Sequence, residues 1–170
     1  SFDSNVKILR NFYQNRGKYA LHHLNVLYGI NDDWQDDLNM IDQFGWSIWM
    51  NDGAGSIEYN DDGSVTVNVT RTGQYAQVSS STVSLQAGKT YRMTYKISTS
   101  QNISSYSMFQ QGTGDYKSYY YQDHTFTPNA QTITDTVTMT ESDDNVKFLI
   151  GLDKGTGMYR ISDFSMVCLN

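Results

Sequence analysis

The stretch that decides the fold is residues 65–98, VTVNVTRTGQYAQVSSSTVSLQAGKTYRMTYKIS. Val65, Val67 and Val69 alternate with polar residues, which is the period-two pattern of a strand with one buried face. The same alternation returns between Tyr91 and Ile97, after a turn at residues 86–89. The stretch therefore predicts successive β-strands joined by short turns.

The residues that follow this stretch continue the pattern. We expect further strands at residues 103–111, 116–127, 132–140, 146–152 and 158–168. Several short strands separated by turn residues are typical of an all-β sandwich or barrel rather than of βαβ units. The fold class predicted from the residues is therefore all-β.

The first part of the chain has a different sequence pattern from the rest. Residues 1–38 place apolar side chains at helix-like spacing, but Gly17 and the Asn/Asp-rich residues 31–37 interrupt it. We expect residues 1–38 to be an N-terminal extension or linker, partly helical, and residues 39–170 to be one β-sandwich domain. A domain of about 150 residues buries roughly 70% of its extended surface, so a second domain is not required.

Composition narrows the class of partner. The net charge is −6 with only 12 Lys and Arg, which argues against nucleic acid or an anionic membrane as partner. The chain has 13 Tyr against 7 Phe, an excess of the side chain that offers an apolar face together with a polar rim. Cys168 is the single cysteine, so no intrachain disulfide can form. No apolar run approaches the roughly 20 residues of a membrane span. A neutral ligand is the better expectation.

Enzymatic residues are scarce. Glycoside hydrolysis needs two carboxyl groups at a defined separation, but Glu58 and Glu141 are the only glutamates and both lie in or beside predicted loops. His22, His23 and His124 lack metal-ligand spacing, and no G-x-S-x-G motif occurs. We therefore expect that the chain is not an enzyme.

Four segments, taken in order, resemble the jelly-roll carbohydrate-binding modules of families 4, 9 and 22. They are an opening segment around a Trp, Leu38–Trp46; an Arg-Thr-x-x-aromatic stretch, Thr70–Tyr75; a Leu-x-x-Gly-Lys-Thr-Tyr turn, Leu85–Tyr91; and an aliphatic-x-Asp-x-x-x-aliphatic strand, Ile161–Val167. The opening lacks the usual Asn-x-x-Phe-Glu sequence, and Asp163-Phe164 stands where two adjacent Asp residues are common.

The resemblance implies a jelly-roll β-sandwich that binds β-glucan, xylan or a related plant cell-wall polysaccharide in a cleft. It also implies a secreted or extracellular protein whose attached glycoside hydrolase domain, in the same polypeptide, does the cutting. The alternative is an adhesion or spacer module of the cell surface, whose tyrosines would only pack. The two readings differ in whether Trp49, Tyr75 and Tyr106 share one exposed face.

Strand parity nominates the residues that would bind a sugar. If Ala76 and Val78 face the core, Tyr75 and Gln77 face outward on the same strand. The same reasoning places Trp49 opposite to Trp46, and Tyr106 and Gln110 opposite to Phe109. The resemblance also implies sugar contacts at or near these positions for Trp49, Tyr75 and Tyr106. The tyrosines at positions 116, 119, 120 and 121 must occupy both faces, so we expect at least one of them near the cleft. Tyr116 and Tyr120 are taken as candidates, although the pattern does not decide which of the four contacts a ligand. The alternative for each is packing in the core or an ordinary solvated strand face.

The resemblance further implies a structural calcium ion. Its ligands would be Asp42, the backbone carbonyl of Gly63 and Asp163, and hard oxygen ligands of this kind suit Ca²⁺. Alternatively, the two carboxylates are ordinary solvated or capping groups.

Overall fold

The computed structural model describes residues 6, 28–29 and 39–170. The expected N-terminal extension, residues 1–38, lies almost wholly outside the described residues. The chain divides into two units, Ser1–Asp37 and Leu38–Asn170, and the fold given below is that of the second. Within the described residues, no helix is long and apolar enough to cross a membrane.

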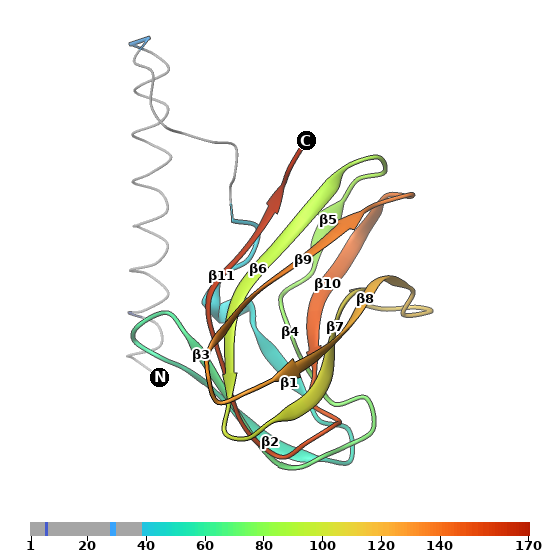
Figure 1. Ribbon diagram of the computed structural model, residues 1–170. Coiled ribbons are helices and arrows are strands. Elements are labelled where there is room, and N and C mark those ends of the chain that lie inside the picture. The colour runs from blue at the N-terminus through green and yellow to red at the C-terminus, as the bar shows by residue number, and fades with distance from the viewer. Residues whose placement is uncertain (1–5, 7–27, 30–38) are drawn as a thin grey trace. The chain divides into compact units, whose positions relative to one another are not determined.

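The second unit is a sandwich of two antiparallel sheets (Figure 1). A short 3₁₀ helix, η1 (Gln43–Gly45), precedes the first strand. The six-stranded sheet contains, in spatial order, β1 (Ser47–Trp49), β4 (Gln77–Ser79), β10 (Asp143–Gly151), β7 (Ile103–Gln111) and β8 (Ser118–Phe126), while β5 (Val83–Leu85) also pairs with β10. The five-stranded sheet contains β2 (Ala54–Tyr59), β3 (Val65–Arg71), β11 (Gly157–Cys168), β6 (Thr90–Thr99) and β9 (Gln131–Thr138).

The chain changes sheet repeatedly as it proceeds. It passes from β3 to β4, from β5 to β6, from β6 to β7 and from β8 to β9, each time entering the other sheet. Two antiparallel sheets built by such crossings form the jelly-roll sandwich. The predicted fold class, an all-β jelly-roll β-sandwich, is confirmed. The long strands lie where the alternation predicted them, whereas β1, β2 and β5 were not predicted as separate strands.

The core lies between the two sheets and is rich in aromatic rings. The Phe148 ring lies 5.3 Å from the rings of both Tyr95 and Phe109 and meets the Trp46 ring edge-on at 6.5 Å. All four side chains are fully buried. Trp46 is therefore a core residue, as its place in the sequence pattern predicted. Because the inward positions of β10 and β7 are filled in this way, their alternate residues are directed to the outer face of the six-stranded sheet.

Candidate functional site

Five residues from five strands form a row across the outer face of the six-stranded sheet. Trp49 pairs with Gln77, and Gln77 pairs in turn with Gly151. Ile150 pairs with Ser107 on the antiparallel strand β7, so the next residue of β10, Gly151, lies opposite Tyr106. Tyr106 pairs in turn with Asp123. Directly paired residues point to the same side of a sheet. The outer row therefore consists of Trp49, Gln77, Gly151, Tyr106 and Asp123.

Tyr106 lies flat within this row. A Cβ atom built on Gly151 would come 2.5 Å from two carbons of the Tyr106 ring, so the ring lies across the glycine. The Tyr121 ring stacks beside it, with centroids 5.3 Å apart and planes 22° apart. Tyr106 is 9% exposed while Tyr121 is half exposed. Tyr121 is therefore the aromatic surface that this pair offers on the outer face, and the largely buried Tyr106 ring supports it.

Two acceptor oxygens beside the row lack a partner among the described residues. They are Oε1 of Gln77 and Oδ1 of Asp153, and both atoms are buried. The Asp153 carboxylate faces the Tyr106 hydroxyl; burial, followed by this negative charge, raises the pKa of Tyr106. A buried acceptor without a hydrogen bond costs about 1–3 kcal/mol. Hydroxyl donors of a bound ligand would remove that cost.

Trp49 and Tyr75 supply the exposed aromatic surface at one end of the row. Trp49 is 51% exposed and Tyr75 is 64% exposed. Tyr75 precedes β4 rather than lying within it, and its φ of 62° puts it in the left-handed region. A residue other than glycine adopts this region at a cost of about 1–2 kcal/mol. The exposed ring is held in a strained backbone by the surrounding loop, a combination that is frequent at functional sites.

The Arg71–Tyr75 segment is fixed against the loop that follows β1. Arg71 donates two hydrogen bonds, of 3.1 and 2.9 Å, to the Asp52 carbonyl. The Asp52 carboxylate accepts from the Gln74 amide at 3.2 Å, and Asn51 donates to the Gln74 carbonyl. These contacts bring the Tyr75 loop beside the end of β1, where Trp49 lies.

Gly73 lets the two loops approach. A Cβ atom at position 73 would come 2.1 Å from the Met50 carbonyl oxygen, so only glycine fits there. The Arg-Thr-x-x-aromatic motif is thus explained physically. Arg71 and Gly73 dock the loop, and Tyr75 is the side chain that the loop presents.

The remaining predicted residues fall in different places. Gln110 faces outward and pairs with Lys147, further along the strands than the outer row. Tyr116 is exposed in the β7–β8 turn with a φ of 53°. The prediction that Tyr120 lines the outer face is wrong. Its hydroxyl donates to the buried Asp135 carboxylate at 2.8 Å, and its ring packs edge-on against Phe109.

The aromatic residue on the outer face of β8 is instead Tyr121. The alternation of β8 puts Tyr120 inward and its neighbour Tyr121 outward, opposite Met108. Three consecutive tyrosines carry no parity signal in the sequence, so the choice between them could not be made there. Asp153 was also missed, because it lies in a loop and nothing in its sequence neighbourhood marks it.

A buried carboxylate connects the two sheets. Asp135, on β9, is 1% exposed and accepts hydrogen bonds from Ser107 at 2.7 Å, Tyr120 at 2.8 Å and Tyr95 at 3.1 Å. His124 Nε2 lies 3.5 Å from the same carboxylate. Burial raises the pKa of Asp135, but the hydrogen bonds from His124, Ser107 and Tyr120 outweigh it and leave the pKa below its ordinary value. The carboxylate is therefore held in its charged form.

This cluster does not form a nucleophilic triad, although it contains the residue types of one. Ser107 is fully buried and cannot meet a substrate. His124 directs the same ring atom, Nε2, toward both Ser107 and Asp135. In a triad the aspartate holds the other ring nitrogen, so that Nε2 is left for the serine. The contacts are those of a structural network in the interior.

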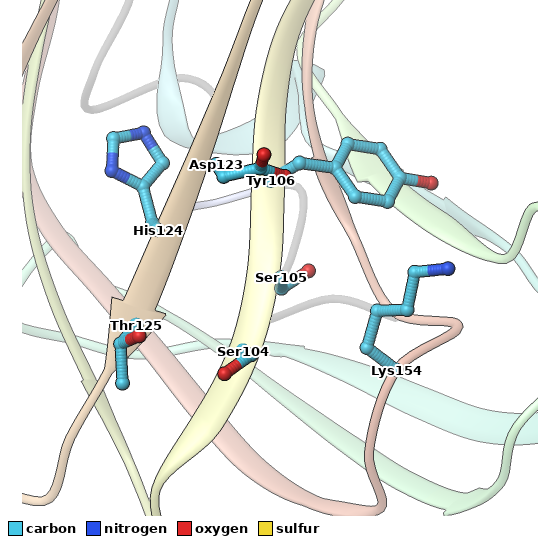
Figure 2. Close-up of a pocket in the computed structure, with 7 residues that line it drawn as sticks. All are labelled: Ser104, Ser105, Tyr106, Asp123, His124, Thr125 and Lys154. Carbon is cyan, nitrogen blue, oxygen red and sulfur yellow. The ribbon is translucent and has the colours of Figure 1, made fainter.

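A cavity of about 410 Å³ opens near one end of the outer row. Figure 2 shows its lining, with the Tyr106 ring and Lys154 on one side of β7 and the His124 ring beyond β8 on the other. The lining residues point to both faces of the sheet, so they do not converge on one ligand. The outer row, where aromatic rings and unpartnered acceptors share a face, is the better candidate site.

The residues expected to hold calcium are engaged otherwise or stand apart. Asp42 caps η1 by accepting from the Gly45 amide. In the turn that contains Gly63, the carbonyls of Asn60 and Ser64 accept hydrogen bonds from the Gln43 amide nitrogen at 2.6 and 2.9 Å. A donor nitrogen there does not suit a cation. Among the described residues, no three Asp, Glu, His or Cys side chains are grouped as metal ligands. Asp163, the third expected ligand, lies in the bulge of β11 with a φ of 48°. The calcium site stays a prediction to which these contacts give little support.

The fold is similar to that of solved carbohydrate-binding modules. A structure described as "CBM4 structure and function" is 18% identical with a TM-score of 0.65, over 78% of this chain and 93% of that one. The N-terminal cellulose-binding domain of β-1,4-glucanase C from Cellulomonas fimi is 18% identical with a TM-score of 0.57, over 72% and 87%. The CBM22-1–GH10 modules of a Clostridium thermocellum endo-1,4-β-D-xylanase, complexed with xylohexaose, are 12% identical with a TM-score of 0.55, over 82% of this chain and 29% of that one.

At these identities the likeness shows the fold alone. No family model matches the sequence, and no curated protein matches it.

Proposed function

We propose that this chain is a non-catalytic carbohydrate-binding module whose outer row binds a β-glycan chain. The observation that carries the proposal is that Trp49 and Tyr106 share one face, beside the unpartnered oxygens of Gln77 and Asp153, with Tyr75 brought next to them by its docked loop. The fold that the chain shares with cellulose- and xylan-binding domains supports the same conclusion.

A sugar ring fits this arrangement chemically. Its axial hydrogens form an apolar face that packs on aromatic rings, and its equatorial hydroxyls donate and accept hydrogen bonds at the ring edge. Tyr121, half exposed and stacked on the largely buried Tyr106 ring, provides an aromatic surface, and the exposed rings of Trp49 and Tyr75 extend it toward the β1 edge of the sheet. A β-linked chain of glucan or xylan type, laid across the strands, would contact these groups in turn.

The adhesion or spacer alternative accounts less well for these residues. It predicts that the tyrosines and Trp49 are used for packing and are scattered over the surface. Trp49 and Tyr75 are instead exposed, and Tyr75 is held in a strained conformation by a docked loop. Hydrolysis is not supported either, because the serine of the one Ser–His–Asp cluster among the described residues is buried. We propose further that the module acts outside the cell and directs an attached glycoside hydrolase to its substrate.

Affinity electrophoresis and calorimetry against xylan, mixed-linkage glucan, glucomannan, xyloglucan and insoluble cellulose test the proposal. We expect wild-type protein to be retarded by at least one soluble β-glycan and Trp49→Ala to be retarded less. Met158→Ala is the matched control, because Met158 is exposed on β11 of the other sheet. Absence of binding across the whole panel by correctly folded protein would favour the spacer reading.

A further inference from the structure

One ammonium group on the outer face of the six-stranded sheet, that of Lys147, has no partner among the described residues. Lys147 lies on β10, pairs in register with Gln110 and is partly buried. Burial alone lowers its pKa, with no contribution from a neighbouring charge. Among the lysines at positions 39–170, it is the only partly buried one without a hydrogen-bond or ion-pair partner.

The carboxylates of this face are engaged elsewhere. Glu141 pairs with Lys117, and Asp143 accepts from the Tyr119 hydroxyl at 2.6 Å and from the Asn145 amide at 2.9 Å. Asp153 and Asp123 lie at the other end of the face, beside Tyr106. Within residues 39–170, Lys147 thus has no carboxylate as an ion-pair partner.

The surroundings of Lys147 do not favour a charge. Its neighbour on the same side of β10 is Leu149, an outward-facing residue that is nevertheless only 2% exposed. Opposite Leu149 lies Met108. Taking an ammonium partly out of water beside apolar groups costs free energy unless a counter-charge relieves it. An ammonium that is partly buried without a counter-charge marks a place where a ligand's anion would be stabilised.

The position also indicates which part of a ligand would be met. Lys147 is four residues from Gly151, which is about 13 Å along the strand. A sugar bound to the exposed Tyr121 ring, beside Tyr106 and Gly151, is therefore too far away for Lys147 to contact it directly. Lys147 would meet a branch, or a part of the glycan that continues along the face.

We propose that the outer face recognises glycans that carry carboxylate groups, with Lys147 pairing with a uronate. This inference rests on the proposed binding of β-glycans and names the class of ligand more closely. A charge-assisted hydrogen bond between the ammonium and a uronate would supply the missing partner. Gln110, directly across the strand, can donate a second hydrogen bond to the same carboxylate.

The test compares glucuronoxylan with the same polymer after reduction of its carboxyl groups. Wild-type protein should bind the acidic form about ten-fold more tightly, the ratio expected of one charge-assisted hydrogen bond. In Lys147→Met, which keeps the length of the stem, the ratio should fall to about one. Lys96→Met is the matched control, because Lys96 is exposed on β6 of the five-stranded sheet, and it should keep the full ratio.

The melting temperature gives a second readout. Lys147→Met should melt at the same temperature as the wild type or higher, because an unpaired ammonium is removed from an apolar setting. Equal affinity of the wild type for both forms of the polymer, or an unchanged ratio in Lys147→Met, would overturn the inference while leaving neutral glycan binding intact. Tight, Lys147-dependent binding of polygalacturonate would support it and put the carboxylate in the main chain rather than in a branch. Failure to bind any glycan, acidic or neutral, would contradict the proposed function itself.

Discussion

The ring of Tyr106 occupies the space where a side chain at Gly151 would stand, since a Cβ atom there would come 2.5 Å from both Cε1 and Cζ of the ring. The glycine is required for room rather than for backbone freedom, because it lies in a regular strand, β10. Without it the ring could not lie parallel to the sheet and stack against Tyr121.

Gly151→Ala should therefore weaken glycan binding. The new methyl group would lift the Tyr106 ring and also crowd the Ser105 hydroxyl, which lies 3.0 Å away. We expect affinity to fall by about 1–2 kcal/mol, as for the loss of one interface aromatic, and stability to fall by about 1–3 kcal/mol through overpacking. Calorimetry and thermal melting measure the two effects. Val67→Ala, which destabilises the five-stranded sheet, is the control and should leave affinity unchanged. Unaltered affinity in Gly151→Ala would remove Tyr106 from the site.

Two substitutions of Tyr75 should weaken binding equally but differ in their free energy of unfolding. Tyr75→Ala is expected to lower affinity by about 1–3 kcal/mol, the range of interface hot spots, while the fold is kept. Tyr75→Gly should bind as weakly and should also be more stable than the alanine variant by about 1 kcal/mol, because glycine adopts a φ of 62° without strain. Denaturant unfolding and calorimetry on the two variants separate these effects. An unchanged dissociation constant in both would exclude Tyr75 from binding.

The buried Asp135 should make stability depend on pH in the acid range. Its pKa in the folded protein is below the unfolded value of about 3.9, so the unfolded chain takes up the proton first as pH falls. The contribution of Asp135 to the free energy of unfolding is fully present above about pH 4 and is lost as pH falls through the folded pKa. Asp135→Asn should lower the free energy of unfolding at pH 7 by about 1–3 kcal/mol.

The difference in free energy of unfolding between wild type and Asp135→Asn should then become smaller toward pH 3. Denaturant unfolding at several pH values measures it. Asp143, whose pKa is lowered mainly by the Tyr119 hydroxyl, contributes in the same direction in both proteins and so cancels in the comparison. A difference in free energy of unfolding that does not change with pH would show that the charge of Asp135 does not stabilise the fold.

Calcium dependence is tested by chelation. A structural ion at Asp42, Gly63 and Asp163 would stabilise the protein by mass action, so EDTA would lower the melting temperature. We expect no shift, because the Gln43 amide already satisfies the carbonyls of Asn60 and Ser64. A decrease in the presence of EDTA that added Ca²⁺ reverses would establish the ion. In that case Asp163→Ala should abolish the response.

The sequence predicted the long strands well because each has one face in the core. Val65, Val67 and Val69 alternate with polar residues, and all three are buried as the alternation requires. β1, β2 and β5 were not predicted as separate strands, and β1 and β5, of three residues each, are too brief for alternation to mark their bounds. They are strands because their neighbours supply hydrogen bonds, and that depends on contacts distant in sequence.

Strand parity put candidate residues on the correct face where it applied and failed where it did not, and their role in binding stays a prediction. Trp49, Gln77 and Tyr106 share one face, as expected from their buried neighbours. Tyr120 was misplaced, because in a run of tyrosines every position looks alike and only the hydrogen bond to Asp135 decides which one turns inward. Asp135 itself was missed. An aspartate in an alternating strand looks solvated until the partners that surround it, from β6, β7 and β8, are known.

The Asp135 network also constrains how the sandwich assembles. Its carboxylate comes from one sheet, and Ser107, Tyr120 and His124 come from the other. If the sheets stacked in a shifted arrangement, the carboxylate would be enclosed in an apolar interior without donors, at a cost of several kcal/mol. Aliphatic contacts between sheets tolerate sliding, but this cluster does not. Misaligned collapsed states of the folding chain are therefore disfavoured relative to the single native alignment, which also sets the shape of the sheet beneath the glycan-binding residues.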